Sequence, residues 1–197
     1  MIHCNENENL QLIVKSLQDD EVILSSSDTV LGLFAQLSEK SKKRLDLIKQ
    51  RNLKPYIVLL SSTALLGGFI DQELDASMQK IIKIYWPGPL TIIFKAKSSL
   101  PDWMKSEQGT IAIRIPNHER LQKILQHVDG LFTTSANISD QQLPQQFSDI
   151  NPLILDQVKV VVCDQNKIYD GPASTILDFA SSKVRIVRQG SIVIDSI

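Results

Sequence analysis

Clusters of hydroxyl, amide and cationic side chains recur along the chain, each beside a short apolar segment. The sequence SSSDT spans residues 25–29, and TTSANIS spans residues 133–139. Lys49 and Arg51 lie two residues apart, and Arg114 ends the mainly apolar segment TIAIR. Guanidinium and ammonium groups hold phosphates and carboxylates, while hydroxyl and amide groups orient them. Because open α/β sheets bind ligands at strand ends, these clusters are candidates for a site that takes a polar, anionic molecule.

Each cluster also has an ordinary structural interpretation. Lys49 and Arg51 end a predicted helix, where cations interact favourably with the helix dipole. Hydroxyl and carboxylate residues that follow a strand are common in turns and as helix N-caps. Arg114 shares one face of its predicted strand with Ala112, so an edge or a solvated face explains it about as well as a ligand does. Taken singly, the clusters leave both interpretations open.

Several familiar catalytic and nucleotide-binding motifs are absent from the sequence. It has 8 glycines and contains neither GxxxxGK[ST] nor GxGxxG, which excludes the usual glycine-rich phosphate loops. GxSxG and HExxH are also absent. The 3 histidines and 2 cysteines have no metal-ligand spacing, so the sequence predicts no protein-held metal centre.

Hydrophobic periodicity predicts the elements that must position these clusters. Apolar residues at helical spacing predict helices at residues 8–18, 41–50, 74–86 and 117–126. Apolar and β-branched segments predict strands at residues 22–25, 56–60, 90–95, 110–115, 131–134, 158–162, 174–178 and 184–188. The sequence Pro87-Gly88-Pro89 should end the third helix, and Asn117 should cap the fourth. Strands alternate with helices early and cluster late, so we expect one α/β domain, residues 1–197, with a mixed sheet.

Charge and composition limit the classes of partner. Lys and Arg total 21 against 22 Asp and Glu, and this near-balance argues against tight, non-specific nucleic-acid binding. Weak contact with tRNA or another RNA stays open. The two cysteines, Cys4 and Cys163, are far apart, which excludes a disulfide framework and favours a reducing compartment. With no apolar segment of roughly 18–20 residues and a polar N-terminal sequence, we expect a cytoplasmic protein without membrane contact.

Six motifs occur in the same order as in a known family. They are SSDTVLG at 26–32, Lys49 and Arg51 with KPYIVLL at 54–60, WPGPLT at 86–91, GTIAIRIP at 109–116, TTSANIS at 133–139, and GPASTILD at 171–178 with IVRQG at 186–190. In these motifs the chain resembles the YrdC/TsaC family of threonylcarbamoyl-AMP synthases. The resemblance runs from about the first predicted helix to near the C-terminus. It implies a single-domain, open, twisted mixed β-sheet flanked by helices, with a concave substrate cleft.

The resemblance implies an activity as well as a fold. The family joins L-threonine, bicarbonate or CO2, and ATP to form threonylcarbamoyl-AMP and pyrophosphate, which makes it a nucleotidyltransferase. Mg2+ would bridge phosphate oxygens with few protein ligands. Proteins of tRNA modification would use the product to make threonylcarbamoyladenosine.

Individual residues take roles from the same resemblance. The implied catalytic residues are Lys49, Arg51 and Arg114. The implied ATP-binding residues are Lys49, Arg51, Thr134, Ser135, Asn137 and Arg188. The implied residues for threonine and bicarbonate are Ser27, Thr29, Thr110, Arg114 and Ser174.

Four positions depart from the family pattern. Ser26 and Asn52 stand in place of prolines, Leu31 replaces a tyrosine, and Leu59 lies where many relatives have a histidine. These departures leave open a divergent paralogue that binds nucleotides or double-stranded RNA without this activity. A further interpretation is a carbamoyl-handling domain like those in hydrogenase-maturation carbamoyltransferases. The retained Ser-Ala-Asn sequence favours the synthase, because one paralogous branch lacks it.

Overall fold

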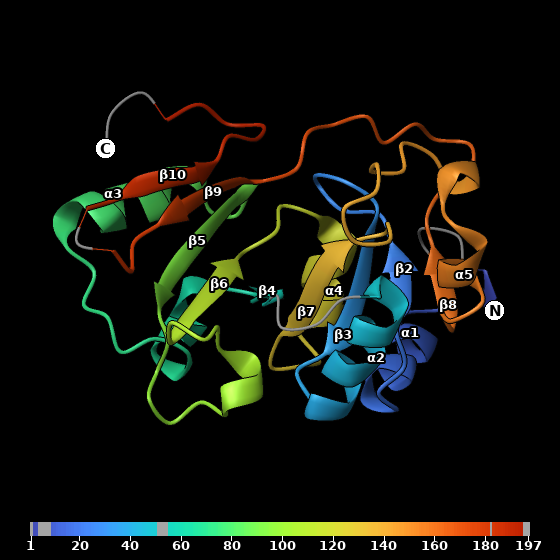
Figure 1. Ribbon diagram of the computed structural model, residues 1–197, viewed down its shortest axis with the longest axis horizontal. Coiled ribbons are helices and arrows are strands. Elements are labelled where there is room, and N and C mark those ends of the chain that lie inside the picture. Colours follow the sequence, from blue (N-terminus) through green and yellow to red (C-terminus); the bar gives the residue numbers. More distant parts are fainter. Residues whose placement is uncertain (1, 4–8, 51–54, 182, 195–197) are drawn as a thin grey trace.

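A computed structural model describes residues 2–3, 9–50, 55–181 and 183–194 of the 197-residue chain. Within these residues one ten-stranded sheet runs through the molecule in the order β1-β8-β2-β3-β7-β4-β6-β5-β9-β10 (Figure 1). The strands are β1 (Ile2–His3), β2 (Ile23–Ser25), β3 (Gly32–Gln36), β4 (Ile57–Leu59), β5 (Leu90–Lys95), β6 (Thr110–Arg114), β7 (Leu131–Ser135), β8 (Val160–Val162), β9 (Thr175–Asp178) and β10 (Arg185–Arg188).

The sheet is mixed and open, as the sequence predicts. Four pairs of neighbouring strands are parallel, namely β1/β8, β8/β2, β4/β6 and β5/β9. The other neighbouring pairs are antiparallel, namely β2/β3, β3/β7, β7/β4, β6/β5 and β9/β10. The end strands β1 and β10 do not pair with each other, so the sheet does not close into a barrel.

Helices cover both faces of the sheet. The α-helices are α1 (Leu10–Gln18), α2 (Glu39–Lys49), α3 (Ala76–Tyr85), α4 (Glu119–Leu125) and α5 (Pro152–Leu155). Short 3-10 helices occupy Thr63–Gly68, Asp102–Met104 and Phe147–Asp149. In the described residues, no helix has both the length and the apolar character needed to cross a membrane.

Two hydrophobic cores form because side chains alternate between the faces of each strand. In β3, Phe34 enters the core beneath α1 and α4, whereas Leu33 and Ala35 enter the larger core beneath α2, α3 and α5. In β8, Val160 and Val162 take the first face, and Val161 takes the second. Because side chains alternate in this way, the position of a polar residue in its strand determines which face of the sheet its side chain lies on.

The structure corrects the predicted strands in the first half of the chain. β3 was not predicted from the sequence, although it pairs with β2 and β7 in the middle of one half of the sheet. Its sequence GLFAQ contains glycine and alanine, which are poor strand formers. The pairing on both sides and the burial of Leu33 and Phe34 outweigh this weak local preference.

The helix ends are partly as predicted. α3 ends at Tyr85, directly before Trp86 and Pro87, as the proline-rich sequence predicts. The predicted Asn117 cap is wrong, because His118 precedes α4 and its Nδ1 accepts a hydrogen bond from the backbone N–H of Leu121 at 3.4 Å. The backbone N–H of Asn117 donates instead to Asp28 Oδ2 at 2.9 Å.

Burial of the central strands predicts a large difference between two isoleucine substitutions. Ile92 of β5 is fully buried, whereas Ile84 of α3 is 59% exposed. We expect Ile92→Ala to lower the free energy of unfolding by about 2–5 kcal/mol, because it leaves a cavity in the core. Ile84→Ala, the matched control, should change it by less than about 0.5 kcal/mol. Urea denaturation of both variants measures this, and equal effects would contradict the assignment of β5 to the core.

Candidate active site

One cavity of about 300 Å³ collects most of the predicted site residues. This volume lies at the lower end of the range for small-molecule sites. Its wall contains Ser27, Thr29, Arg114, Thr134, Ser135, Ser174 and Arg188. They come from the β2–β3 loop, the ends of β6 and β7, the start of β9 and the end of β10. Residues that lie up to 161 positions apart in sequence therefore face one space.

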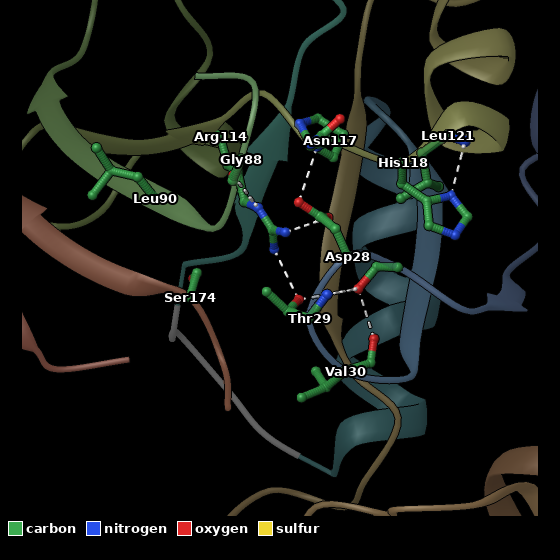
Figure 2. Close-up of polar contacts among 12 residues, drawn as sticks. Asp28, Thr29, Val30, Gly88, Leu90, Arg114, Asn117, His118, Leu121 and Ser174 are labelled. Carbon is green, nitrogen blue, oxygen red and sulfur yellow. Dashed lines mark hydrogen bonds and ion pairs between the residues drawn. The ribbon is translucent and has the colours of Figure 1, made fainter. Parts of the chain in front are cut away.

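The segment that follows β2 forms both a turn and a wall of the cavity. Ser27 Oγ donates to the carbonyl of Val30 at 2.7 Å and accepts from the backbone N–H of Thr29 at 3.1 Å (Figure 2). Thr29 Oγ1 lies 3.0 Å from Ser27 Oγ and accepts a hydrogen bond from Arg114 Nη1 at 3.0 Å. The two interpretations of this sequence are therefore compatible, because the hydroxyl that closes the turn belongs to a residue that also lines the cavity.

Arg114 is buried at the end of β6 and has defined partners for every nitrogen. Nε donates to the carbonyl of Gly88 at 3.1 Å, and Nη1 donates to Thr29 Oγ1. Nη2 forms an ion pair with Asp28 Oδ1, and the Asp28 side chain is itself only 12% exposed. A guanidinium has five N–H groups, so two remain beyond these three contacts, on a residue that lines the cavity. This geometry favours a ligand position for Arg114 over a solvated sheet face.

Arg188 brings a second guanidinium to the same cavity. Its Nε and Nη2 donate to the carbonyl of Ser174 at 3.1 and 2.9 Å, and Nη2 also lies 3.1 Å from Ser174 Oγ. That hydroxyl lies 2.8 Å from Thr91 Oγ1. Desolvation of the guanidinium, and then the charge of Arg114, lower the pKa of Arg188. Two guanidinium groups on the wall of one cavity make that cavity favourable for an anion, because an anion offsets the repulsion between them.

Glycine allows the chain after β10 to approach Ser174. A Cβ atom built on Gly190 would collide with the backbone of Ala173, Ser174 and Thr175. Gly190 N–H donates to Thr175 Oγ1 at 3.0 Å, and Thr175 Oγ1 donates to the carbonyl of Ile192 at 2.7 Å. These contacts hold the segment that carries Arg188 against the start of β9.

Lys49 is not among the described residues that line the cavity, so its expected contact with ATP stays a prediction. Its side chain is buried, with 2% of its surface exposed, and Nζ donates to the carbonyl of Ser135 at 2.7 Å. Nζ also donates to the carbonyl and, at 2.8 Å, to Oδ1 of Asn137. Lys49 therefore fixes the end of β7 and the loop that follows, because its ammonium donates to oxygens of both Ser135 and Asn137.

Asn137 is also absent from the cavity wall in the described structure. Its Oδ1 accepts from Ser135 Oγ at 2.6 Å, and its Nδ2 donates to the carbonyl of Gln141 at 2.6 Å. Of the predicted Ser-Ala-Asn sequence, Ser135 reaches the cavity and Asn137 supports it. Arg51 lies outside the described residues, so its predicted role stays a prediction.

Thr110 is far from Arg114. It begins β6, while Arg114 ends it, and four residue-to-residue steps along the strand separate them by roughly 13 Å. The Thr110 hydroxyl lies 2.7 Å from Ser106 Oγ, in the turn before the strand. The expected contact between Thr110 and threonine is therefore withdrawn.

Two of the three described departures from the family pattern lie away from the cavity. Leu31 is fully buried in the larger core, and Ser26 is buried with its Oγ 3.4 Å from His118 Nε2. Neither lines the cavity, whereas Leu59 does. Asn52 lies outside the described residues. Among the departures that the structure describes, Leu59 alone alters the wall.

Sequence reasoning missed the apolar part of the cavity. Phe34, Ile57 and Leu121 line it together with Leu59. Their types are typical of a core, so the sequence offered no signal that these particular side chains border a site. The period-two alternation of β3 would have placed Phe34 on the side opposite Leu33, had that strand been recognised.

Comparison with known proteins shows the family of this chain. The family model for Sua5, YciO and YrdC, described as telomere recombination, matches residues 15–190. The chain belongs to the Sua5/YciO/YrdC family. A threonylcarbamoyl-AMP synthase of Vibrio cholerae is 31% identical over 187 residues, which cover 93% of this chain and 98% of the relative.

Solved structures of other family members share the fold. P. abyssi Sua5, solved in complex with L-threonine, has a TM-score of 0.85 and 24% identity; the match covers 96% of this chain and 57% of that protein. E. coli YciO has a TM-score of 0.81 and 19% identity, with 96% and 94% covered. These similarities confirm the open α/β fold expected for the family.

The buried contacts of Lys49 predict a structural cost when its charge is removed. Lys49→Met keeps the side-chain length but leaves the carbonyls of Ser135 and Asn137 without this donor. We expect a loss of about 1–3 kcal/mol in the free energy of unfolding. Lys43→Met on the same helix is the control, because Lys43 is 71% exposed and, among the described residues, pairs only with Glu39. Equal stability of the two variants would show that Lys49 does not hold this loop.

Proposed function

We propose that this protein is a threonylcarbamoyl-AMP synthase, which forms threonylcarbamoyl-AMP and pyrophosphate from L-threonine, bicarbonate or CO2, and ATP. The observation that carries the proposal is the pair of guanidinium groups, Arg114 and Arg188, facing one hydroxyl-lined cavity. The Vibrio cholerae relative of that name matches nearly the whole chain and supports the same activity.

The reaction requires positioning and charge stabilisation more than a protein nucleophile. A carbamate oxygen attacks the α-phosphorus of ATP, the bond to the bridging oxygen breaks, and pyrophosphate leaves with its negative charge. AMP is transferred, so the proposed enzyme is a nucleotidyltransferase. Fixed cations and hydroxyl groups can align the reacting groups and stabilise the developing charge. The cavity contains both kinds of group.

We divide these residues into a threonine end and a nucleotide end according to the hydrogen bonds that they share. Ser27, Thr29 and Arg114 are linked by hydrogen bonds, and we assign them to threonine and its carbamate, since a guanidinium binds carboxylates through parallel hydrogen bonds. Ser174 and Arg188 are linked in the same way, and we assign Arg188 to the phosphates of ATP. Thr134 and Ser135 supply hydroxyl groups from β7. Lys49 and Asn137 would act indirectly, by fixing Ser135.

Mg2+ belongs to this proposal as an ion carried by the phosphates of ATP. Among the described residues, Asp28 is the sole carboxylate on the cavity wall, and both its oxygens already accept hydrogen bonds. The described chain also has no group of three His, Cys, Asp or Glu residues that could hold a metal ion. We therefore assign no protein ligand to Mg2+.

The product defines the partners that the proposal requires. A mixed anhydride of a carbamate and a phosphate is reactive, so proteins of tRNA modification should receive it in the cytoplasm. The net charge of −1 gives no electrostatic basis for tight RNA binding by this chain. An RNA-binding module without catalysis gains no support from the cavity, whose cations are turned toward a small space. The proposed unit is a single domain over residues 1–197.

Pyrophosphate release tests the activity directly. The protein is incubated with ATP, bicarbonate and Mg2+, and release is followed with and without L-threonine. We expect turnover that requires threonine, and a product whose mass equals that of threonylcarbamoyl-AMP. Pyrophosphate release that is independent of threonine, or no release by folded protein, would refute the proposal.

Two arginines on β10 offer a matched test of the nucleotide end. Arg188→Ala removes a cation from the cavity and should lower kcat/KM for ATP at least 30-fold. Arg185→Ala, on the same strand, removes an arginine that is 68% exposed and paired with Asp178, so its kcat/KM should stay within threefold of wild type. Steady-state kinetics with varied ATP measure both. A similar loss in the two variants would place the effect in the strand rather than in the cavity.

A further inference from the structure

Asp28 has an arrangement that neither a turn nor a substrate ligand requires. It lies in the loop between β2 and β3, and its carboxylate contacts two other segments of the chain (Figure 2). Oδ1 pairs with Arg114 Nη2 at the end of β6, and Oδ2 accepts the backbone N–H of Asn117 at 2.9 Å. We propose that Asp28 is a positioning residue that fixes the guanidinium of Arg114 for the reaction proposed above.

The hydrogen bonds of Arg114 indicate how this fixation works. Its three nitrogens each donate to a different acceptor, namely Gly88 O, Thr29 Oγ1 and Asp28 Oδ1. Contacts at all three nitrogens define the orientation of the guanidinium, because the group is rigid and flat. Asp28 provides the one charged acceptor of the three. The two N–H groups that remain then point in fixed directions, which is the condition for aligning a carboxylate or carbamate.

The contact with Asn117 fixes the carboxylate in turn. Asp28 Oδ2 is held by a backbone N–H next to the residue that caps α4, so the carboxylate cannot rotate away without losing that bond. The loop after β2, the end of β6 and the start of α4 are thereby joined through one side chain. A neutral amide at position 28 has a single acceptor oxygen and could satisfy only one of these two partners.

Charge balance gives a second reason for a carboxylate at this position. Within the described residues, no carboxylate lies within 4 Å of Arg188, so Asp28 offsets one of two facing positive charges. Without it, repulsion from Arg188 would act on an Arg114 side chain that has lost its strongest partner. Loss of the Asp28 carboxylate therefore has two effects, on orientation and on charge balance. Both predict a less well-placed Arg114 guanidinium.

Kinetics of single and double variants test the inference through Arg114. Asp28→Asn should lower kcat/KM for L-threonine at least tenfold, and Asp28→Glu should recover at least threefold of that loss. If Asp28 acts through Arg114, Asp28→Asn should cost less than threefold in an Arg114→Lys background, since coupled residues are not additive. A further tenfold loss in that background, or no loss in the single variant, would overturn the inference. Asp71→Asn is the control, because Asp71 also accepts a backbone N–H but lies outside the cavity.

A spectroscopic measurement separates this inference from the proposed function. In 15N-arginine-labelled protein, a guanidinium held at all three nitrogens gives distinct Nη signals, whereas a rotating one gives averaged signals. The Arg114 signals are assigned by their loss in Arg114→Lys. They should be distinct in wild type and in Asp71→Asn, and averaged in Asp28→Asn. If wild type lacks threonine-dependent turnover, the proposed function fails and these signals alone decide the role of Asp28; unchanged signals in Asp28→Asn would refute it.

Discussion

A buried guanidinium at the end of β6 is the constraint on which the site depends. Arg114 is 5% exposed, and a charge with so little water needs partners from the protein. Its acceptors come from the β2–β3 loop and from the turn after α3, so both segments must meet the end of β6. The ion pair is weak evidence for stability, since its desolvation cost is large. Its consequence is a defined geometry around the cavity.

Lys49 is a second buried cation that needs acceptor atoms from the protein. It is 2% exposed, and its ammonium donates to the carbonyl groups of Ser135 and Asn137. In both cases a buried cation satisfies backbone or side-chain oxygens that come from distant segments. Arg114 retains donors for the cavity, whereas Lys49 lies behind the wall. The two cations therefore differ in position, because Arg114 lines the described cavity and Lys49 does not.

The order of strands in the sheet differs from their order in the sequence, which explains why residues from many parts of the chain line the cavity. β9 follows β8 in sequence but lies at the other end of the sheet, beside β5. The connection between them crosses the top of the molecule in Figure 1 and delivers Ser174 to the wall. β10 then returns antiparallel to β9 and places Arg188 beside Ser174. The local sequence pattern of residues 171–190 predicts two short strands and, taken alone, no site.

The sequence by itself determined the fold class, most helices and strands, and the residue types of the site. It did so because apolar periodicity, proline breaks and ordered motifs are local properties of the chain. Only the tertiary structure decided that Thr110 lies far from Arg114, that Lys49 and Asn137 support the wall, and that Asp28 joins three segments. Those outcomes depend on strand order and on which buried polar atoms find partners, and both arise from contacts between residues far apart in sequence.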